Sequence, residues 1–268
     1  MTWEDIPYLQ KTWIKKTAWF LANLFTLGNI VIAVVGIVYT FINPENYVFW
    51  FAKFLAVCSI LDFADGKLAR ISGSKKLAID VDTIVDSISF GVFPAVYLGN
   101  LIAKWEYSMR EISTGWSITL GIITGLIYLG AVWFRLYRFV KRDPLYTPYF
   151  NGLPSPFAAM VIACLVIFPD TPEWGILIAT IIISGFMLSK IPLPSFKGVP
   201  SKFDLYWIIT TTILFVLFIA MPFQPVNLMI YPAYVIAVYM LVYLTGGPEY
   251  AMKLEEKYKE KGSMKEEK

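Results

Sequence analysis

Five aspartates lie in the stretch DFADGKLARISGSKKLAIDVDTIVD, residues 62–86, where two long apolar runs meet, and four of them fall on two helical stripes. On a helix, residues three or four positions apart share one face, so Asp62 and Asp65 lie on one stripe of the first helix. By the same spacing, Asp82 and Asp86 lie on one stripe of the next helix. A charge at membrane depth costs at least about 2.5–3.5 kcal/mol, so these acids need a compensating partner. Carboxylate oxygens are the ligands that magnesium and manganese prefer, and we therefore predict a divalent metal site between the two helices.

Small residues share these stripes with the acids. On the first helix the stripe holds the small residues Gly66 and Ala69, and it also holds Arg70. On the second helix it holds the small residue Ala78. Small side chains allow two helices to approach closely. Asp80 points to the opposite side of its helix, and we leave it out of the site.

The same stretch resembles the signature of the CDP-alcohol phosphatidyltransferase family, which reads DxxDGxxAR and, after a short spacer, GxxxDxxxD. Every fixed position matches except one, since Ala78 stands where the family has its second glycine. The resemblance implies two divalent ions, Mg²⁺ or Mn²⁺, with ligands at Asp62, Asp65, Asp82 and Asp86. It also implies that Asp86 is the catalytic base. A CDP-lipid would be bound by Gly66, Ala69 and Arg70.

Polar residues before the first long apolar run extend the resemblance. Asn23, Thr26 and Asn29, in NLFTLGN, resemble the polar pattern that opens the first span in this family, near the bound cytidine. We expect Asn23 and Thr26 to help bind the CDP-lipid. The alternative is that either side chain caps a helix.

Four later motifs resemble, in order, those of one branch of the family, the class II phosphatidylserine synthases and archaetidylserine synthases. They are SFGVFPA at 89–95, FRLYRF at 134–139, FNGLPSPFAA at 150–159 and LSKIPLPSFKG at 188–198. Arginine binds carboxylates and phosphates bidentately, so Arg135 and Arg138 are candidates for binding the acceptor or a phosphate. Lys197 is a further candidate. The alternatives are arginines that only set the membrane orientation and a lysine in an interfacial loop.

The resemblance implies a metal-dependent transfer of a phosphatidyl or archaetidyl group from a CDP-activated lipid to the hydroxyl of L-serine, with release of CMP. Another member of the family would use glycerol phosphate or inositol phosphate as the acceptor. An ion-coupled transporter would also explain acids at membrane depth. It would not explain Arg70 beside them or the glycine and alanine of the signature. We expect a homodimer that binds a CDP-lipid donor, L-serine and membrane lipids.

The composition is that of a membrane protein. Of the 268 residues, 57% are hydrophobic, and the mean hydropathy is +0.60. Histidine is absent from the sequence, which excludes Ser-His triads and HExxH zinc sites. Because about 20 apolar residues cross a bilayer, we predict an all-α polytopic membrane protein with about eight transmembrane helices. The apolar runs are 26–42, 47–70, 78–103, 115–138, 154–168, 173–189, 204–222 and 226–244.

These runs divide into a six-helix family core over residues 26–189 and two extra spans over 204–244. Residues 1–22 mix tryptophans with lysines, which is typical of an amphipathic helix that lies in the headgroup layer. Residues 246–268 are rich in charge and are expected to form a cytoplasmic tail. No long linker divides the chain, so we predict a single integral-membrane domain over residues 1–245.

The distribution of Lys and Arg predicts the orientation. If the amino terminus is cytoplasmic, 20 of the 23 basic residues fall on that side of the eight spans, and only Lys53, Lys104 and Arg110 fall on the other. This asymmetry follows the positive-inside rule. We therefore expect a plasma-membrane protein whose active site faces the cytoplasm. The net charge of +3 reflects this orientation, and we expect no nucleic-acid partner.

Overall fold

The computed structural model describes residues 12–42, 47–73, 77–104, 114–141, 149–167, 172–190 and 192–194, together with residues 209 and 213. Its helices are α1 (Thr12–Ile42), α2 (Tyr47–Ser72), α3 (Leu77–Asp86), the π-helical turn η3 (Ser87–Val92), α4 (Phe93–Ala103), α5 (Thr114–Lys141), α6 (Ser155–Ile167) and α7 (Glu173–Leu188). The strands β1 (Tyr149–Asn151) and β2 (Pro192–Pro194) form a short antiparallel ribbon in which Tyr149 pairs with Pro194. Apart from this ribbon, the regular structure of the described part is helical, as predicted.

The helix lengths fit a polytopic membrane protein. Among the described residues, three helices are long and apolar enough to cross a membrane: Thr12–Ile42, Val81–Ala103 and Gly115–Lys141. The apolar helices α6 and α7 are shorter, at 13 and 16 residues. The expected spans at 204–222 and 226–244 and the tail at 246–268 lie outside the described residues apart from Ile209 and Ile213, so the count of eight stays a prediction.

The amino-terminal segment differs from the expectation in one respect. Residues 12–22, expected in a separate interfacial helix, are continuous with the first span in the 31-residue helix α1. At 1.5 Å per residue, α1 is about 46 Å long, which exceeds the hydrocarbon core of about 30 Å. The amphipathic segment is therefore an extension of the span beyond the hydrocarbon. Residues 1–11 lie outside the described part.

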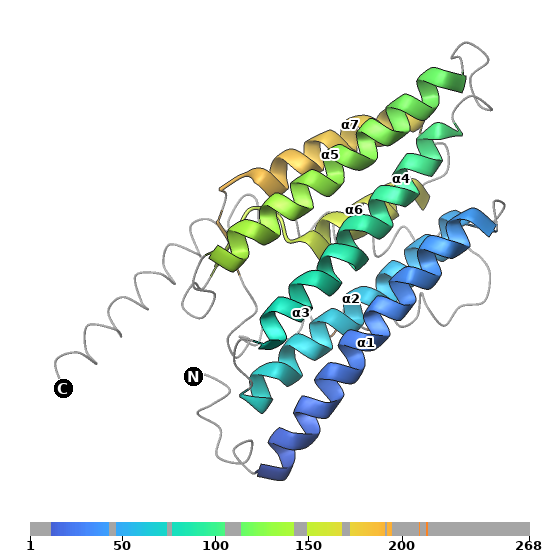
Figure 1. Ribbon diagram of the computed structural model, residues 1–268. Helices are drawn as coiled ribbons and strands as arrows, with labels where there is room; N and C mark the ends of the chain where they lie inside the picture. Colours follow the sequence, from blue (N-terminus) through green and yellow to red (C-terminus); the bar gives the residue numbers. More distant parts are fainter. Residues whose placement is uncertain are drawn as a thin grey trace.

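The helices pack as a bundle in which consecutive rods alternate in direction (Figure 1). Helix α1 packs along α2, α4 packs along α5, and α7 and α6 pack against α5 and α2 respectively. The rod formed by α3, η3 and α4 contacts α1, α2, α5 and α6, so it occupies the centre of the bundle. Because of the alternating directions, the carboxyl end of α2 and the amino end of α3 lie at the same end of the bundle (Figure 1).

Small residues form the contact between α4 and α5. Ala95, Gly99 and Ala103 recur every four residues on α4, and Gly121 and Gly125 do so on α5. A Cβ placed on Gly125 would lie 2.7 Å from the carbonyl oxygen of Ala95, and one on Gly121 would lie 3.0 Å from the amide nitrogen of Ala103. The two backbones are thus in direct contact. In lipid, where van der Waals packing drives helix association, this small-residue pattern is a common interface.

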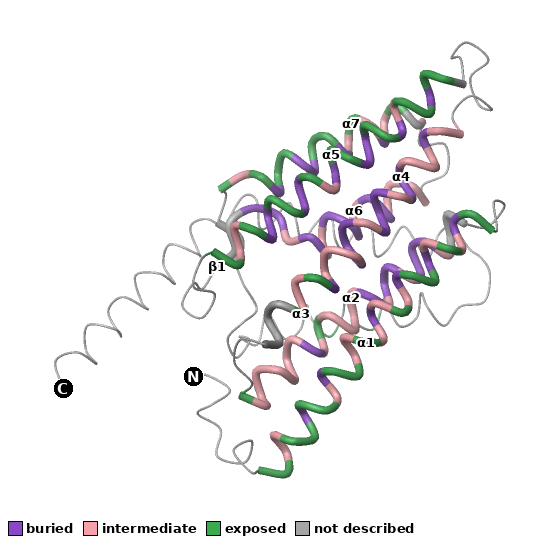
Figure 2. Tube along the Cα trace, viewed as in Figure 1, coloured by how far each residue is buried: buried purple, intermediate pink, exposed green. Residues whose placement is uncertain are grey.

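Aromatic rings fill the space between α1, α2 and α4. Phe51 of α2 stacks on Tyr97 of α4 with ring centroids 3.6 Å apart, and it meets the Phe93 ring edge to face at 5.1 Å. Gly36 of α1 makes room for this ring, since a Cβ there would lie 2.5 Å from the tip of Phe93. One face of α1 and one face of α5 are exposed along the length of each helix (Figure 2). These faces carry large apolar side chains such as Leu27, Val31, Ile122 and Leu126, as expected of a surface that meets lipid.

Candidate active site

The two acidic segments reach the same depth from one end of the bundle. Asp62 is ten residues before the last residue of α2, Ser72, and Asp86 is nine residues after the first residue of α3, Leu77. At 1.5 Å per residue, these separations place the two aspartates about 15 Å and about 14 Å from that end. Helices that run in opposite directions and carry acids at equal depth can bring them together.

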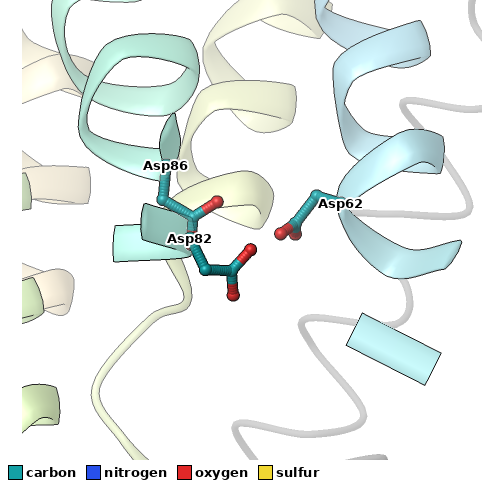
Figure 3. Close-up of side chains that lie close together, drawn as sticks. All are labelled: Asp62, Asp82 and Asp86. Carbon is teal, nitrogen blue, oxygen red and sulfur yellow. The ribbon is translucent and has the colours of Figure 1, made fainter. Parts of the chain in front are cut away.

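Three of the four predicted ligands do converge. Carboxylate oxygens of Asp62, Asp82 and Asp86 all lie within 4.8 Å of one another, with Asp62 reaching across from α2 toward the two acids of α3 (Figure 3). The carboxyl groups of Asp62 and Asp86 also interact directly with each other. Two carboxylates this close require a shared proton or a cation between them.

The donor set fits a hard divalent ion. All three groups offer carboxylate oxygen, which is the ligand type that Mg²⁺ and Mn²⁺ prefer. Among the described residues, Oδ1 of Asp86 and Oδ1 of Asp65 are buried oxygens that accept no hydrogen bond. Buried polar atoms normally have a partner, so these two oxygens are available for a ligand that the protein chain does not supply. The acidic cluster can therefore hold a metal ion.

Asp65 lies beside this cluster and is tied to α1. It is buried, and it interacts electrostatically with Asp82 and Asp62 without belonging to the group of three. Its Oδ2 lies 2.8 Å from the hydroxyl of Thr26, which also lies 3.0 Å from the carbonyl oxygen of Ala22. The single hydroxyl proton of Thr26 is shared between these two acceptors. Thr26 thus links α1 to the acidic site.

Asn23 is placed differently from Thr26. Its side chain is exposed, and its Nδ2 donates to the carbonyl oxygen of Trp19 at 2.8 Å. Both Asn23 and Thr26 lie inside α1, eleven and fourteen residues after its first residue, Thr12. The alternative that either residue caps a helix end is therefore wrong, because neither lies at one.

Arg70 and Gly66 occupy consecutive turns of α2. The Nε of Arg70 donates to the carbonyl oxygen of Gly66 at 2.8 Å, and the guanidinium interacts electrostatically with Asp62 and Asp82. Within the described part of the chain, a Cβ on Gly66 would meet only the Arg70 side chain, at an ordinary contact distance of 3.5 Å. Protein packing therefore does not require glycine at this position. Ala69 is half-buried on the same helix, and the side chain of Ala78 lies outside the described part.

A second cation reaches the acids from α5. Arg135 is buried, at 8% exposed, and interacts electrostatically with Asp86 and Asp62. Its Nη1 donates to the hydroxyl of Ser155, at the start of α6, at 2.7 Å. Reasoning from the sequence missed Ser155 as a member of this site. The signal was present in the motif FNGLPSPFAA, in which Ser155 is the polar residue between two prolines.

Arg138 has a different set of contacts from Arg135. Its two Nη atoms donate to the carbonyl oxygens of Met187, Leu188 and Ser189 at 2.9, 3.0 and 3.2 Å. These carbonyls end α7, where a positive charge is favourable because the helix dipole is negative there. These hydrogen bonds give Arg138 a structural role at the end of α7. Its expected role in binding the acceptor or a phosphate stays a prediction. Lys197 lies outside the described residues.

Gly152 completes the closure of α7. It has a φ of +77°, and a Cβ there would lie 2.6 Å from the carbonyl oxygen of Met187. The next residue, Leu153, donates its N–H to the carbonyl oxygen of Phe186 at 3.1 Å. The GLP segment before α6 is therefore fixed against the end of α7, which places Ser155 beside Arg135.

Together these residues form a site with three clustered acids and two cations in an apolar bundle. Such a site suits a substrate with a polyanionic head and apolar tails, because acids and a divalent ion can bind phosphates while lipid surrounds the bundle.

Comparison with known proteins agrees with this chemistry. The sequence model of the CDP-alcohol phosphatidyltransferase family matches residues 19–191. A protein of Helicobacter pylori (strain ATCC 700392 / 26695), named CDP-diacylglycerol–serine O-phosphatidyltransferase, is 30% identical over 236 residues, which cover 84% of this chain and 88% of the relative. A protein of the same name from Mycobacterium leprae (strain TN) is 30% identical over 153 residues, or 52% of this chain and 47% of the relative.

Proposed function

The chain belongs to the CDP-alcohol phosphatidyltransferase family, as its signature predicted, and we propose that it transfers the lipid-phosphate group of a CDP-activated lipid to the hydroxyl of L-serine. The observation that carries the proposal is the convergence of Asp62, Asp82 and Asp86 on one point at membrane depth. The choice of serine is supported by the names of both relatives. It is also supported by the resemblance of four further motifs to the serine-specific branch of the family.

The acids would hold the metal. Asp62, Asp82 and Asp86 supply a cluster of carboxylate oxygens, and Asp65 adds its buried Oδ1 nearby. This set of ligands suits two ions of Mg²⁺ or Mn²⁺. When bound, such ions neutralise the diphosphate of the donor and improve CMP as a leaving group. Thr26 keeps Asp65 in place through its hydroxyl.

The donor headgroup would bind along α2 and α1. Arg70 lies beside Asp62 and Asp82, where its guanidinium can bind a phosphate oxygen of the diphosphate bidentately. Gly66 and Ala69 would leave the backbone of α2 accessible to the nucleotide, since no contact with the residues that the structure describes requires glycine at position 66. Asn23, exposed on α1 one turn before Thr26, would contact the cytidine.

The acceptor would bind between α5 and α3. Serine carries a carboxylate, and Arg135, held by Ser155, is a buried guanidinium close to Asp86. Asp86 would take the proton from the serine hydroxyl. The serine oxygen then forms a bond to the phosphorus that bears the lipid, and the bond from that phosphorus to the CMP oxygen breaks. CMP leaves with the electron pair of that bond.

The placement of the site would allow a nucleotide headgroup to enter from water while its lipid chains stay in the bilayer. We assign this side to the cytoplasm of the plasma membrane, because most Lys and Arg fall on it. We also assign the protein a homodimeric state. The orientation would be checked by labelling single cysteines placed at Lys75 and Asp170, which should react from opposite sides of the membrane.

A transfer assay tests the proposal directly. Purified protein would be given CDP-diacylglycerol or CDP-archaeol with Mn²⁺ or Mg²⁺, and L-serine, glycerol 3-phosphate or inositol phosphate as the acceptor. We expect CMP release and a serine-containing lipid, identified by mass spectrometry, only with L-serine. Release of CMP with glycerol 3-phosphate but not with serine would overturn the acceptor assignment. Full activity in excess EDTA would overturn the metal assignment.

A further inference from the structure

Pro94 interrupts the hydrogen-bonding pattern of the central rod. In an α-helix the N–H of residue 94 would donate to the carbonyl oxygen of Phe90, but proline has no N–H and its ring clashes with that carbonyl. The chain widens immediately before Pro94 into the π-helical turn η3, in which the N–H of Phe93 donates to the carbonyl oxygen of Ile88, five residues back. Such π turns are often found at functional sites. The turn begins at Ser87, directly after Asp86.

Tyr128 of α5 supplies the donor that Pro94 lacks. Its hydroxyl donates to the carbonyl oxygen of Phe90 at 2.9 Å. Phe90 and Tyr128 are both 0% exposed, so water cannot satisfy that carbonyl in place of the tyrosine. A buried carbonyl without a partner destabilises the fold, which makes the Tyr128 hydroxyl the partner that the π turn requires.

The π turn changes which way Asp86 faces. In an uninterrupted α-helix, Asp86 and Phe93 are seven residues apart and would lie within about 20° of each other. One extra residue in the turn rotates the two ends of the rod relative to each other by about 100°. Accordingly, Phe93 packs against Gly36 of α1 and Phe51 of α2. Asp86 instead meets Asp62 of α2 and interacts with Arg135 of α5.

Helix α5 contacts the π turn at two further points. The Nε1 of Trp133 donates to the hydroxyl of Ser87 at 2.6 Å. Gly91 faces Leu129 and Val132, since a Cβ there would lie 3.2 Å from each side chain. The turn that follows Asp86 is thus held along its length by one face of α5.

We infer that Tyr128 is a positioning residue for the transfer reaction: its hydroxyl replaces the N–H that Pro94 lacks and holds the π turn that directs Asp86 toward Asp62. The inference rests on the proposed role of Asp86. It assigns Tyr128 no contact with the substrate.

The central test is Tyr128→Phe, which removes only the hydroxyl. We expect kcat to fall by about 10- to 100-fold, the range typical for groups that orient metal ligands, with KM for the CDP-lipid unchanged. Binding of Mn²⁺ to the protein without substrate, followed by electron paramagnetic resonance, should weaken as well. Tyr137→Phe, on the exposed face of the same helix, is the matched tyrosine control and should change none of these values.

A stability control separates positioning from general destabilisation. Ile176→Ala creates a cavity in the core near α7, away from the acids, and should lower the melting temperature without changing kcat or Mn²⁺ binding. If Tyr128→Phe behaves like Ile176→Ala, with only the melting temperature lowered, Tyr128 has no positioning role.

Trp133→Phe provides a second route if Tyr128→Phe does not fold. The Trp133 ring is 53% exposed, so its replacement preserves the core while removing the hydrogen bond to Ser87. It should lower kcat and Mn²⁺ binding in the same direction as Tyr128→Phe, by a smaller factor. Unchanged kcat and Mn²⁺ binding in this variant would contradict the inference.

Asp86→Asn distinguishes the inference from the function on which it rests. If Asp86→Asn is inactive while Tyr128→Phe keeps full kcat and Mn²⁺ binding, the positioning role fails and the proposed function stands. If Asp86→Asn itself keeps full activity, the proposed role of Asp86 fails first.

Discussion

The two ends of the central rod use small residues for different reasons. At the α4 end, Gly121 and Gly125 of α5 lie in contact with the α4 backbone, and the protein itself fills the space that a side chain would need. At the site end, the flexible side chain of Arg70 is the one group among the described residues that a Cβ on Gly66 of α2 would meet. A glycine that the fold requires and one that it does not require look alike in a sequence. Beside the acidic cluster, a glycine of the second kind leaves room for something other than protein.

The two ends also differ in how their polar groups are satisfied. The α4–α5 contact is made by small residues and backbone. The site end gathers three carboxylates within 4.8 Å and leaves buried oxygens of Asp65 and Asp86 without a hydrogen bond among the described residues. A region that breaks the packing rules without compensation from the protein is where function is expected. The comparison can be tested by changing each end separately.

The largest effect is expected for Asp86→Asn. The amide keeps the shape of the side chain but cannot accept the serine proton, and loss of a general base typically costs about 10²- to 10⁴-fold in rate. Affinity for the CDP-lipid in the presence of metal should change far less than in Asp65→Asn. Titration of CDP-lipid binding and measurement of CMP release would check both values. Loss of CDP-lipid binding as complete as in Asp65→Asn would make Asp86 chiefly a metal ligand.

We expect a bound metal ion to stabilise the protein only through the acids at the site end. A ligand at 100 times its Kd that binds only the folded state adds about 2.7 kcal/mol of stability. We expect Mn²⁺ to raise the melting temperature of the wild type and of Gly125→Ala by similar amounts, and to have little effect on Asp82→Asn. Thermal unfolding in detergent with Mn²⁺ or EDTA measures this. An equal Mn²⁺ effect in Asp82→Asn would show that the ion binds elsewhere.

A single added methyl group should destabilise the α4–α5 contact. In Gly125→Ala the new Cβ would lie 2.7 Å from the backbone of Ala95, so the helices must separate. Overpacking of this kind costs typically about 1–3 kcal/mol. Gly130→Ala is the matched control, because Gly130 lies on α5 and no atom of the described residues lies within 4 Å of the new Cβ. It should stabilise the helix by up to about 1 kcal/mol. Equal melting temperatures for the two variants would contradict the close backbone contact.

The smallest effect on stability is expected for Gly66→Ala. Its Cβ meets Arg70 at an ordinary contact distance, so the melting temperature should stay the same or rise slightly. If the nucleotide lies against this backbone, KM for the CDP-lipid should rise by roughly tenfold, equivalent to about 1.4 kcal/mol of binding. Enzyme kinetics and thermal unfolding of the same preparation check both points. Unchanged KM would mean that the donor binds away from Gly66.

Much of this architecture could be predicted from the sequence, because helix spacing and helix length act locally. The depth of Asp62 and Asp86 follows from where α2 ends and α3 begins. From the spacing of the acids we predicted that those of the two helices lie together, and three of them do. The contacts missed were those between segments distant in sequence. Thr26 meets Asp65 across 39 residues, and the partners of Arg138 follow it by about 50. No local pattern specifies such pairs.

The sequence also did not predict the π turn, for a different reason. Its local cause, a proline inside an apolar run, was visible at Pro94. What could not be read from the sequence is how the chain would accommodate it, because a kink or a π turn would each relieve the clash. The choice depends on Tyr128, which lies 38 residues from Phe90 in the sequence and meets its carbonyl only in the folded bundle.

The contacts of Arg138 also set an order of events during biosynthesis. The three carbonyl oxygens that accept its hydrogen bonds follow it by 49, 50 and 51 residues. At about 5–20 residues per second, the ribosome needs about 3 to 10 s to make that stretch. Throughout that interval the guanidinium of a newly inserted α5 has none of these partners. Its position one turn from the end of α5 lets the side chain extend to the water interface in the meantime, at far lower cost than at the bilayer centre.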